Sequence, residues 1–327
     1  MMPLLAPLVG DAAAVTFIGL CKNAGKTTAM CRLIAELADE RLAMTSVGRD
    51  GERTDVVTGT EKPEIWVRQG TLFATAKGLL PLCDVTAEVV ASTDVLTPLG
   101  QVAVFRARSD GYVQLAGPSA VGQLEPLKQI FFQLGAQRIL IDGAAGRKSL
   151  AGAGENGCAV LCVGASMDGT VEYIAAETAH VCDLFAVQPI CLHHQNARFA
   201  LFDPDGAPLP LEFGADGLPV WKSLPQGHCT VWTSGGVTTP MLRALAQRGA
   251  PTTLAAPDAT HFLFDRAAAQ LFARQGGQLR VERRLHIAAV CVNPWSAYGK
   301  HLDQNQLLSA LRKAVSIPVV NAKEAEL

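Results

Sequence analysis

Short apolar runs alternate with helix-like patterns over the first half of the chain. Residues 14–18 form an apolar run of strand length, and apolar residues within 27–40 recur three or four positions apart, as on one helix face. The same two patterns continue downstream, where strands are predicted at 44–47, 139–141 and 158–164 and a helix at 171–184. Repeated β-α-β units predict an α/β fold with a mainly parallel sheet that carries helices on both faces.

The stretch from residue 56 to residue 117 has few continuous apolar runs before 102–105. We predict helices at 71–80 and 87–93, and a long glycine- and polar-rich loop at 106–123. Loops of this length in an α/β domain are often functional, and an ordinary surface loop is the alternative. The candidate ligand contacts in this loop are Arg106, Arg108, Ser109 and Asp110.

The amino-acid composition of the chain changes at residue 193. Residues 193–222 are rich in proline, glycine and aspartate, which predicts a β-hairpin or irregular excursion at a domain boundary. Beyond it we predict strands at 229–233, 252–255, 286–292 and 317–320, and helices from Thr239, at 265–274 and at 304–315. We therefore expect a first domain over 1–192 and a smaller C-terminal α/β domain over 193–327.

Composition agrees with a globular α/β protein. The chain has 327 residues, of which 49% are hydrophobic and 18% charged, and its formal net charge is −2. This balance argues against a general nucleic-acid binder, and no apolar run is long enough to cross a bilayer. The N-terminus lacks the basic region of a secretory peptide, so we expect a cytoplasmic protein without a membrane anchor.

The turn between the first predicted strand and helix is the strongest functional signal. It reads FIGLCKNAGKTT from Phe17 to Thr28, and the pattern is that of a phosphate-binding loop with five residues, not four, between Gly19 and Gly25. Glycines let backbone N–H groups approach phosphate oxygens, Lys26 adds a positive charge, and a threonine hydroxyl can ligate Mg²⁺. We expect a nucleotide to be held by Gly19, Asn23, Ala24, Gly25, Lys26, Thr27 and Thr28.

Three oxygen ligands for Mg²⁺ are predicted: Thr27, Asp142 and Asp50. Asp142 ends the buried run 139–141, where a carboxylate beside a phosphate loop usually serves the metal. Asp50 lies in the segment GRDGERTD together with Glu52 and Asp55, for which an ordinary polar turn is the alternative. The catalytic set is Lys26, Asp142 and Lys22, with Lys22 as a second cation toward the γ-phosphate.

Other polar groups follow predicted strands. After the run ending at Asp142 come Arg147, Lys148 and Ser149, and after 286–292 come Asn293, Ser296, Tyr298 and Lys300. The first set suits phosphate or partner contact, and the second suits recognition of a base or a second ligand; solvated loop residues are the alternative for both. The pair His193–His194 lacks a third ligand at a recognisable spacing, so turn histidines are favoured over a metal site.

Nine cysteines include no C-x-x-C pair, which favours reduced thiols in the core. Cys21 is the exception, because it lies within the loop near Lys22 and Lys26. Neighbouring cations and backbone donors would lower the pKa of its thiol, and we therefore hypothesise a reactive cysteine.

Six phrases carry a resemblance to a known family: FIGLCKNAGKTT, TSVGRDGE, DVVTGTEKP, SDGYVQLAGPS, IDGAAGRKSLA and VNPWSAYG. Over most of its length the chain resembles the P-loop reactivase component of lysine 5,6-aminomutase and ornithine aminomutase systems. The loop is also similar to those of dethiobiotin synthetase and of molybdopterin-guanine-dinucleotide accessory proteins. The resemblance implies a P-loop NTPase fold, with Gly19, Lys22, Gly25, Lys26, Thr27 and Thr28 on the nucleotide and Asp142 on the metal.

The function implied by this resemblance is a Mg²⁺-dependent ATPase. It would work with a second ATPase subunit to rescue an aminomutase that uses adenosylcobalamin and pyridoxal phosphate. The D-x-H-x-x-G signature of cobalamin domains is missing, so the corrinoid is expected to stay on the partner. The resemblance further implies that Lys22 acts across a homodimer interface, as in related P-loop proteins. Two alternatives stay open: a dethiobiotin-synthetase-like ligase or kinase acting on a small carboxylate, and a nucleotide-gated binding protein or metallochaperone with little turnover.

Overall fold

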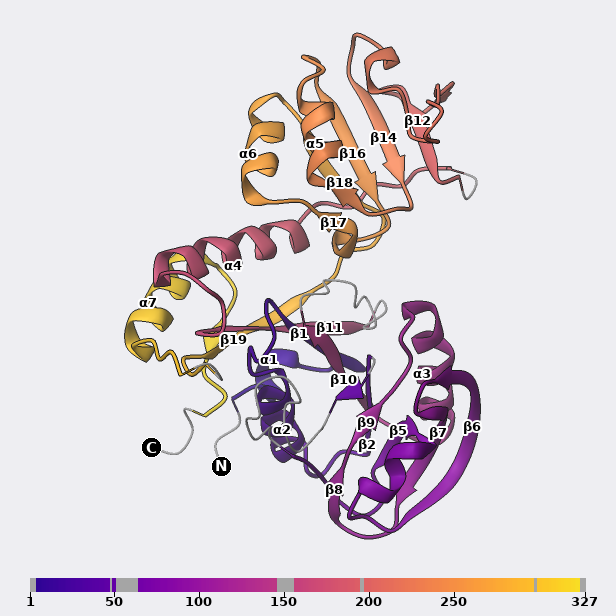
Figure 1. The fold of residues 1–327 in the computed structure, drawn as a ribbon, viewed down its shortest axis with the longest axis vertical. Helices are drawn as coiled ribbons and strands as arrows, with labels where there is room; N and C mark the ends of the chain where they lie inside the picture. Colours follow the sequence, from indigo (N-terminus) through magenta and orange to yellow (C-terminus); the bar gives the residue numbers. More distant parts are fainter. Residues whose placement is uncertain are drawn as a thin grey trace. The chain divides into compact units, whose positions relative to one another are not determined.

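The computed structural model describes residues 4–47, 49–50, 64–145, 156–194, 197–296 and 299–323. The chain divides into two compact units. Unit 1 comprises residues 1–179 and 286–327, and unit 2 comprises residues 180–285. Both are α/β structures (Figure 1).

Unit 1 is built on a nine-stranded sheet in the order β20-β19-β11-β1-β10-β2-β5-β7-β6. Its strands, in chain order, are β1 (Ala14–Gly19), β2 (Leu42–Ser46), β5 (Leu72–Ala76), β6 (Ala87–Thr97), β7 (Gly100–Ala107), β10 (Arg138–Ala145), β11 (Gly157–Gly164), β19 (Ile287–Asn293) and β20 (Val319–Val320). The strands from β20 to β5 pair in parallel, whereas β7 pairs antiparallel with both β5 and β6. The sheet is therefore mixed.

Helices and short strands complete unit 1. The helices are α1 (Ala6–Val9), α2 (Lys26–Glu36), α3 (Leu124–Gln133), the first part of α4 (Val171–Phe185) and α7 (Gln304–Ala314). Two small antiparallel sheets join β3 (Arg49–Asp50) to β9 (Leu115–Ala116), and β4 (Ile65–Val67) to β8 (Gly111–Val113). Within the described ranges, no helix of the chain is both long enough and apolar enough to cross a membrane.

Helices α2 and α3 cover opposite faces of the large sheet. Val15 and Phe17 of β1 pack in the same core cluster as Met30 and Leu33 of α2. Their neighbour Ala14 instead belongs to the cluster that contains α3. Because side chains alternate between the two faces of a strand, these two clusters lie on opposite sides of the sheet.

Unit 2 has a five-stranded sheet in the order β13-β12-β14-β16-β18. Its elements are the rest of α4, β12 (Phe199–Phe202), β13 (Pro208–Leu209), β14 (Cys229–Thr233), β15 (Val237–Thr238), α5 (Thr239–Ala246), β16 (Thr252–Ala256), β17 (Phe262–Leu263), α6 (Arg266–Arg274) and β18 (Gln278–Val281). The central strands β14, β16 and β18 are parallel, and β12 joins β14 antiparallel. The predicted hairpin is present as the antiparallel pair β12–β13.

Two predicted helices are in fact strands. Residues 71–80 contain β5 followed by a 3₁₀ turn over Lys77–Leu82, and residues 87–93 lie in β6. All five residues of β5 are buried between β2 and β7, and a short run that is apolar on every side has no periodicity that separates strand from helix. In β6 the valines and threonines have side chains that favour strands.

Two further expectations differ from the structure. The loop predicted at 106–123 contains the short strands β8 and β9. The strand predicted at 286–292 was assigned to the C-terminal domain, but β19 pairs with β11 in the large sheet of unit 1. The chain thus leaves unit 1 for residues 180–285 and then returns, a path that a division at residue 192 does not describe.

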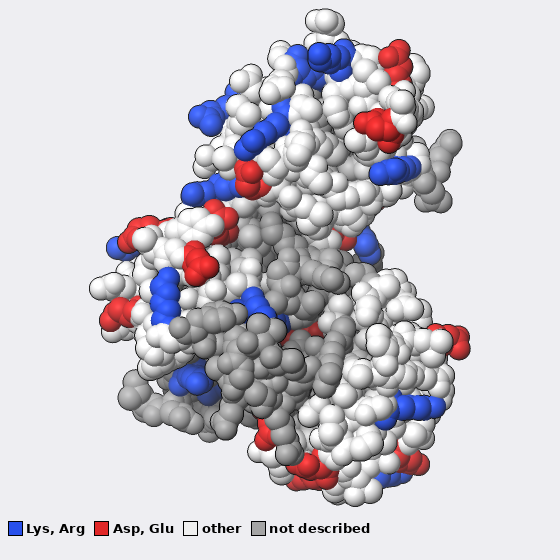
Figure 2. Space-filling view, in the orientation of Figure 1, with Lys and Arg blue, Asp and Glu red and all other residues white. Residues whose placement is uncertain are grey.

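Charged side chains are spread over both units. On the face shown in Figure 2, basic and acidic groups lie in separate small clusters among uncharged residues. This distribution agrees with the near-zero formal net charge of −2.

Candidate functional site

The loop between β1 and α2, residues 20–25, is the centre of the candidate site. Asn23 is the single non-glycine residue with positive φ in the described chain, at 59°, and Gly25 at the N-terminus of α2 has φ 94°. A left-handed conformation is tolerated by asparagine and favoured by glycine. Left-handed residues in a turn let successive N–H groups converge on an anion, as in the nests that bind phosphate.

Lys26 lies back over this loop. A Cβ atom on Gly19 would be 3.2 Å from Cδ of Lys26, so the absence of a side chain at residue 19 makes room for the lysine stem. Lys26 is only 9% exposed, and within the described residues it forms no ion pair. A largely buried lysine without an acidic partner is costly unless an anion accompanies it.

A second polar atom in the loop lacks a partner. The side-chain nitrogen of Asn23 is buried and makes no hydrogen bond within the described part of the chain. Buried polar atoms are nearly always paired, so an orphan donor beside an uncompensated ammonium indicates a site for an anionic ligand. These two observations fit the phosphates of a nucleotide.

Thr27 and Asp142 meet on the other side of the loop. The Thr27 hydroxyl donates a hydrogen bond to Oδ2 of Asp142 at 3.0 Å, and Asp142 is 0% exposed. Parallel pairing of β1 and β10 places Asp142 beside Phe17, near the end of β1. Thr27, at the start of the helix that follows β1, can therefore reach Asp142 although the two residues are far apart in the sequence.

This pair fits a magnesium ion that arrives with a nucleotide. No group of three or more His, Cys, Asp or Glu side chains suited to a metal exists in the described residues. Mg²⁺ commonly takes only one or two protein oxygens and completes its shell with phosphate and water. Thr27 and Asp142 would supply those protein oxygens.

Two more loops join the phosphate loop at the carboxyl ends of β11 and β19. Asn293 donates from Nδ2 to the carbonyl oxygen of Asn23 at 3.2 Å, and the Ser166 hydroxyl donates to the same oxygen at 3.4 Å. Ser166 also contacts the Ser296 hydroxyl at 3.4 Å. Polar side chains from the ends of β11 and β19 therefore meet at the Asn23 carbonyl oxygen in the loop after β1, and the carboxyl ends of parallel strands are where such sheets usually bind ligands.

Close packing supports this junction. A Cβ on Gly25 would be 3.1 Å from Cβ of Asn293, and a Cβ on Gly164 would be 1.9 Å from the Asn293 carbonyl oxygen. Sequence reasoning named Asn293 and Ser296 but missed Ser166 and Gly164. The signal for both was their position at the end of the predicted strand 158–164.

The remaining predicted residues have varied surroundings. Ala24 is buried, Thr28 is half-buried at the start of α2, and Lys22 is exposed. The backbone of Asp50 lies in β3, but its side chain is outside the described residues, as are Glu52, Asp55, Arg147, Lys148, Ser149 and Tyr298. Lys300 donates to the carbonyl oxygen of Gly169 at 2.7 Å.

The candidates of the 106–123 segment make local structural contacts. Arg108 forms an ion pair with Glu88 on the neighbouring strand. The Ser109 hydroxyl accepts from the Thr86 backbone at 2.9 Å, and Asp110 accepts from the Gln69 backbone at 2.8 Å. An ordinary surface loop, the alternative given for this segment, accounts for these contacts.

His194 lies in unit 2. It pairs with Glu282 at 2.7 Å and stacks on Trp232 with ring centroids 3.6 Å apart. These contacts agree with the preference for a structural histidine.

The cysteine hypothesis requires correction. Burial is the largest influence on Cys21 and raises the pKa of its thiol to about 11, although the positive charge of Lys26 opposes this shift. The negative charge of Asp168 raises the pKa further. Desolvation thus outweighs the cation, and the thiol is protonated at neutral pH.

Comparison with known proteins identifies no relative. No protein-family model, curated protein or solved structure matches the chain.

Proposed function

We propose that this chain binds ATP at the loop between β1 and α2 and hydrolyses it with Mg²⁺, in a fold of the P-loop NTPase type. The observation that carries the proposal is the largely buried Lys26, which has no ion-pair partner in the described residues. The Thr27–Asp142 hydrogen bond and the orphan donor of Asn23 support it independently.

Each group of the loop has a separate role in binding the phosphates of ATP. Backbone N–H groups from Asn23 to Thr27 hold the β-phosphate, and Lys26 bridges oxygens of the β- and γ-phosphates. Thr27 and Asp142 would hold Mg²⁺, and the ion would supply positive charge against the phosphate oxygens. Positioning and charge stabilisation account for most of the catalysis of phosphoryl transfer.

Hydrolysis requires an oriented water molecule and a second positive charge. A bond forms from the water oxygen to the γ-phosphorus while the bond to the β–γ bridging oxygen breaks, which yields ADP, phosphate and a proton. We infer that the exposed Lys22 approaches the γ-phosphate when the loop is loaded. Asn293, Ser166 and Ser296 fix the loop from the side of β11 and β19.

We further propose that ATP turnover serves the reactivation of an adenosylcobalamin-dependent aminomutase. Six sequence phrases support this role through their resemblance to the reactivase family. A mutase that has lost its radical retains damaged cobalamin, and ATP hydrolysis would drive an exchange that binding alone does not complete. The partners would be a second ATPase subunit and the aminomutase itself.

The first test is ATP turnover by the full chain with Mg²⁺. We expect Lys26→Ala to lower the rate at least 100-fold, in line with the loss of about 10²–10³ for one preorganised charge-stabilising group. Phosphate release measures the rate of turnover, and calorimetric titration measures the binding of ATP. Lys77→Ala is the matched control, since Lys77 contacts the Gln101 side chain at 2.9 Å, outside the candidate site.

The outcome separates the three candidate functions. An unchanged rate in Lys26→Ala would remove the ATPase assignment. ADP formation that strictly requires a small carboxylate would replace it with the ligase or kinase, and tight ATP binding without turnover would favour the nucleotide-gated binding protein. ATP-dependent recovery of an inactivated aminomutase, lost in Lys26→Ala, is the result expected for the reactivase.

A further inference from the structure

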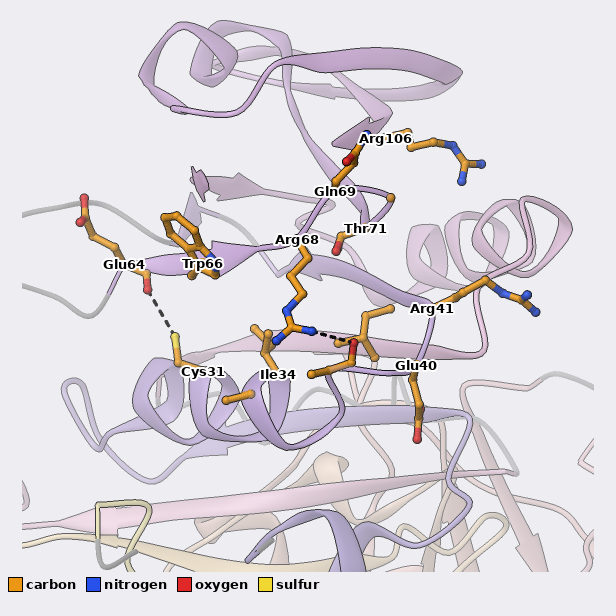
Figure 3. Close-up of a pocket in the computed structure, with 14 residues that line it drawn as sticks. Cys31, Ile34, Glu40, Arg41, Glu64, Trp66, Arg68, Gln69, Thr71 and Arg106 are labelled. Atoms are coloured by element: carbon orange, nitrogen blue, oxygen red, sulfur yellow. Dashed lines mark hydrogen bonds between the residues drawn. The ribbon is translucent and has the colours of Figure 1, made fainter. Parts of the chain in front are cut away.

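A pocket of about 440 Å³ lies on the outer face of α2, away from the phosphate loop. Its floor is apolar and comes from α2 and the turn that follows, with Ile34, Ala35 and Ala38. Its opposite wall is β4 and the connection to β5 (Figure 3). This volume falls in the range of small-molecule sites, which typically combine an apolar lining with a few placed polar groups.

Three arginines line this pocket: Arg41, Arg68 and Arg106. Each contacts a backbone carbonyl oxygen, with Arg68 at 3.4 Å from Ala38, Arg41 at 2.9 Å from Gly135 and Arg106 at 3.5 Å from Leu134. No ion pair involves them within the described residues. A guanidinium carries five N–H donors, so each retains donors for a ligand.

This pattern differs from that of the other arginines nearby in unit 1. Arg32 pairs with Glu36, and Arg138 pairs with Glu40. The Glu40 carboxylate, which borders the pocket, is thus already neutralised by Arg138. Figure 3 shows the Glu64 carboxylate pointing away from Arg68, so the pocket has an excess of positive charge.

An exposed indole stands beside the central arginine. Trp66 is 46% exposed, and its ring meets the Tyr112 ring edge-on at 4.8 Å. Figure 3 shows Arg68 between Trp66 and Thr71, with its guanidinium above α2, whereas the Arg41 and Arg106 side chains extend away from Arg68 and Trp66. Indole and guanidinium planes both stack on flat rings, and the guanidinium also binds carboxylate, sulfonate and phosphate groups.

We propose that this pocket binds a small planar anion: an aromatic or heteroaromatic ring that carries a carboxylate, sulfonate or phosphate group. The ring lies against Trp66 and the apolar floor of α2. The acidic group is bound by Arg68, and Arg41 and Arg106 add to the positive potential. The site is separate from the nucleotide site and does not depend on its function.

The test uses naphthalene-2-sulfonate with the full chain and no nucleotide. We expect saturable binding of one molecule per chain, measured by calorimetry and by quenching of tryptophan fluorescence. Arg68→Gln should weaken binding at least tenfold, and the uncharged 2-naphthalenemethanol should bind at least tenfold more weakly than the sulfonate. Trp66→Phe should remove most of the fluorescence change.

Arg108→Gln is the matched control, since Arg108 lies just after β7, pairs with Glu88 of β6 and does not line the pocket. It should leave binding unchanged. Thermal melting verifies that each variant is folded, and Trp66→Phe provides a second measurement should Arg68→Gln unfold. Absence of saturable binding, equal affinity for the neutral compound, or full binding by folded Arg68→Gln would each overturn the proposal.

Discussion

At the residue scale, the cost of burying charge decides what the loop between β1 and α2 can bind. Lys26 is covered by the protein, yet no acidic side chain in the described ranges forms an ion pair with it. The neighbouring Asp142 is fully buried and accepts a hydrogen bond from Thr27. A loop that keeps the lysine apart from a carboxylate is prepared for an external anion, because a lysine paired with an aspartate would have to break that pair first.

The cost of burying a charge also makes Cys21 a poor nucleophile, because it exceeds the stabilisation of the thiolate by Lys26. Burial raises the pKa of its thiol from 9.0 to about 11, so its thiolate fraction at neutral pH is about 100-fold lower than that of an unperturbed thiol. We expect slow alkylation by iodoacetamide at pH 7.5. The rate should increase about tenfold per pH unit up to pH 10, because only the thiolate reacts.

Mass spectrometry of the labelled peptides measures this rate for each cysteine. The exposed Cys191 serves as the reference within the same molecule. Labelling of Cys21 as fast as that of Cys191 at pH 7.5 would contradict the role that we assign to burial.

At the element scale, the site depends on how closely β19 approaches the phosphate loop. β11 and β19 pair in parallel with Gly164 opposite Asn293, and the turn after Gly164 leads directly to Ser166. A side chain at residue 164 would meet the Asn293 carbonyl oxygen at 1.9 Å. The pairing of these two strand ends is thus possible only with glycine.

We therefore expect Gly164→Ala to damage both the fold and the site. Displacement of β19 should lower the free energy of unfolding by about 1–3 kcal/mol, as overpacking typically does, and should weaken ATP binding at least tenfold. Thermal melting and calorimetric titration measure the two effects. Gly122→Ala is the control, since a Cβ there has nothing within 4 Å. Wild-type binding and melting in Gly164→Ala would show that this junction does not support the site.

Strand identity also depended on the tertiary structure at this scale. The segment 87–93 contains alanine and glutamate, which suit a helix, together with valine and threonine, which suit a strand. Antiparallel pairing of β6 with β7 decided between them. By contrast, the strand at 14–18 and the helix at 27–40 were predicted correctly in type, because a glycine turn separates a short apolar run from a clear helical periodicity there.

At the scale of the whole molecule, all described residues of the candidate site belong to unit 1. They come from β10, from the loop and helix after β1, and from the carboxyl ends of β11 and β19, although β19 follows the whole of unit 2 in the sequence. Bound ATP should therefore stabilise unit 1, by about 2.7 kcal/mol at a concentration of 100 times its Kd. No site residue that we have named for ATP lies in 180–285.

Hydrogen exchange with and without MgATP measures this effect. We expect increased protection in β1, α2, β10 and β19, and little change in β14, β16 and β18. Lys26→Ala should abolish the difference, which serves as the control for non-specific effects of nucleotide. Equal protection in both units would contradict the assignment of the site to unit 1 alone.

The sequence by itself determined the strand, glycine turn and helix from which a phosphate loop is proposed, and the α/β class. Both are local properties, since the order strand, glycine turn and helix is written within about thirty residues, and the candidate roles of Lys26, Thr27 and Asp142 follow from residue type and position. Only the tertiary structure decided that the large sheet is mixed, that β19 returns to it after unit 2, and that Asn293 and Ser166 meet at Asn23. The reason is that strand pairing and close approach depend on residues far apart in the chain, which a local pattern does not record.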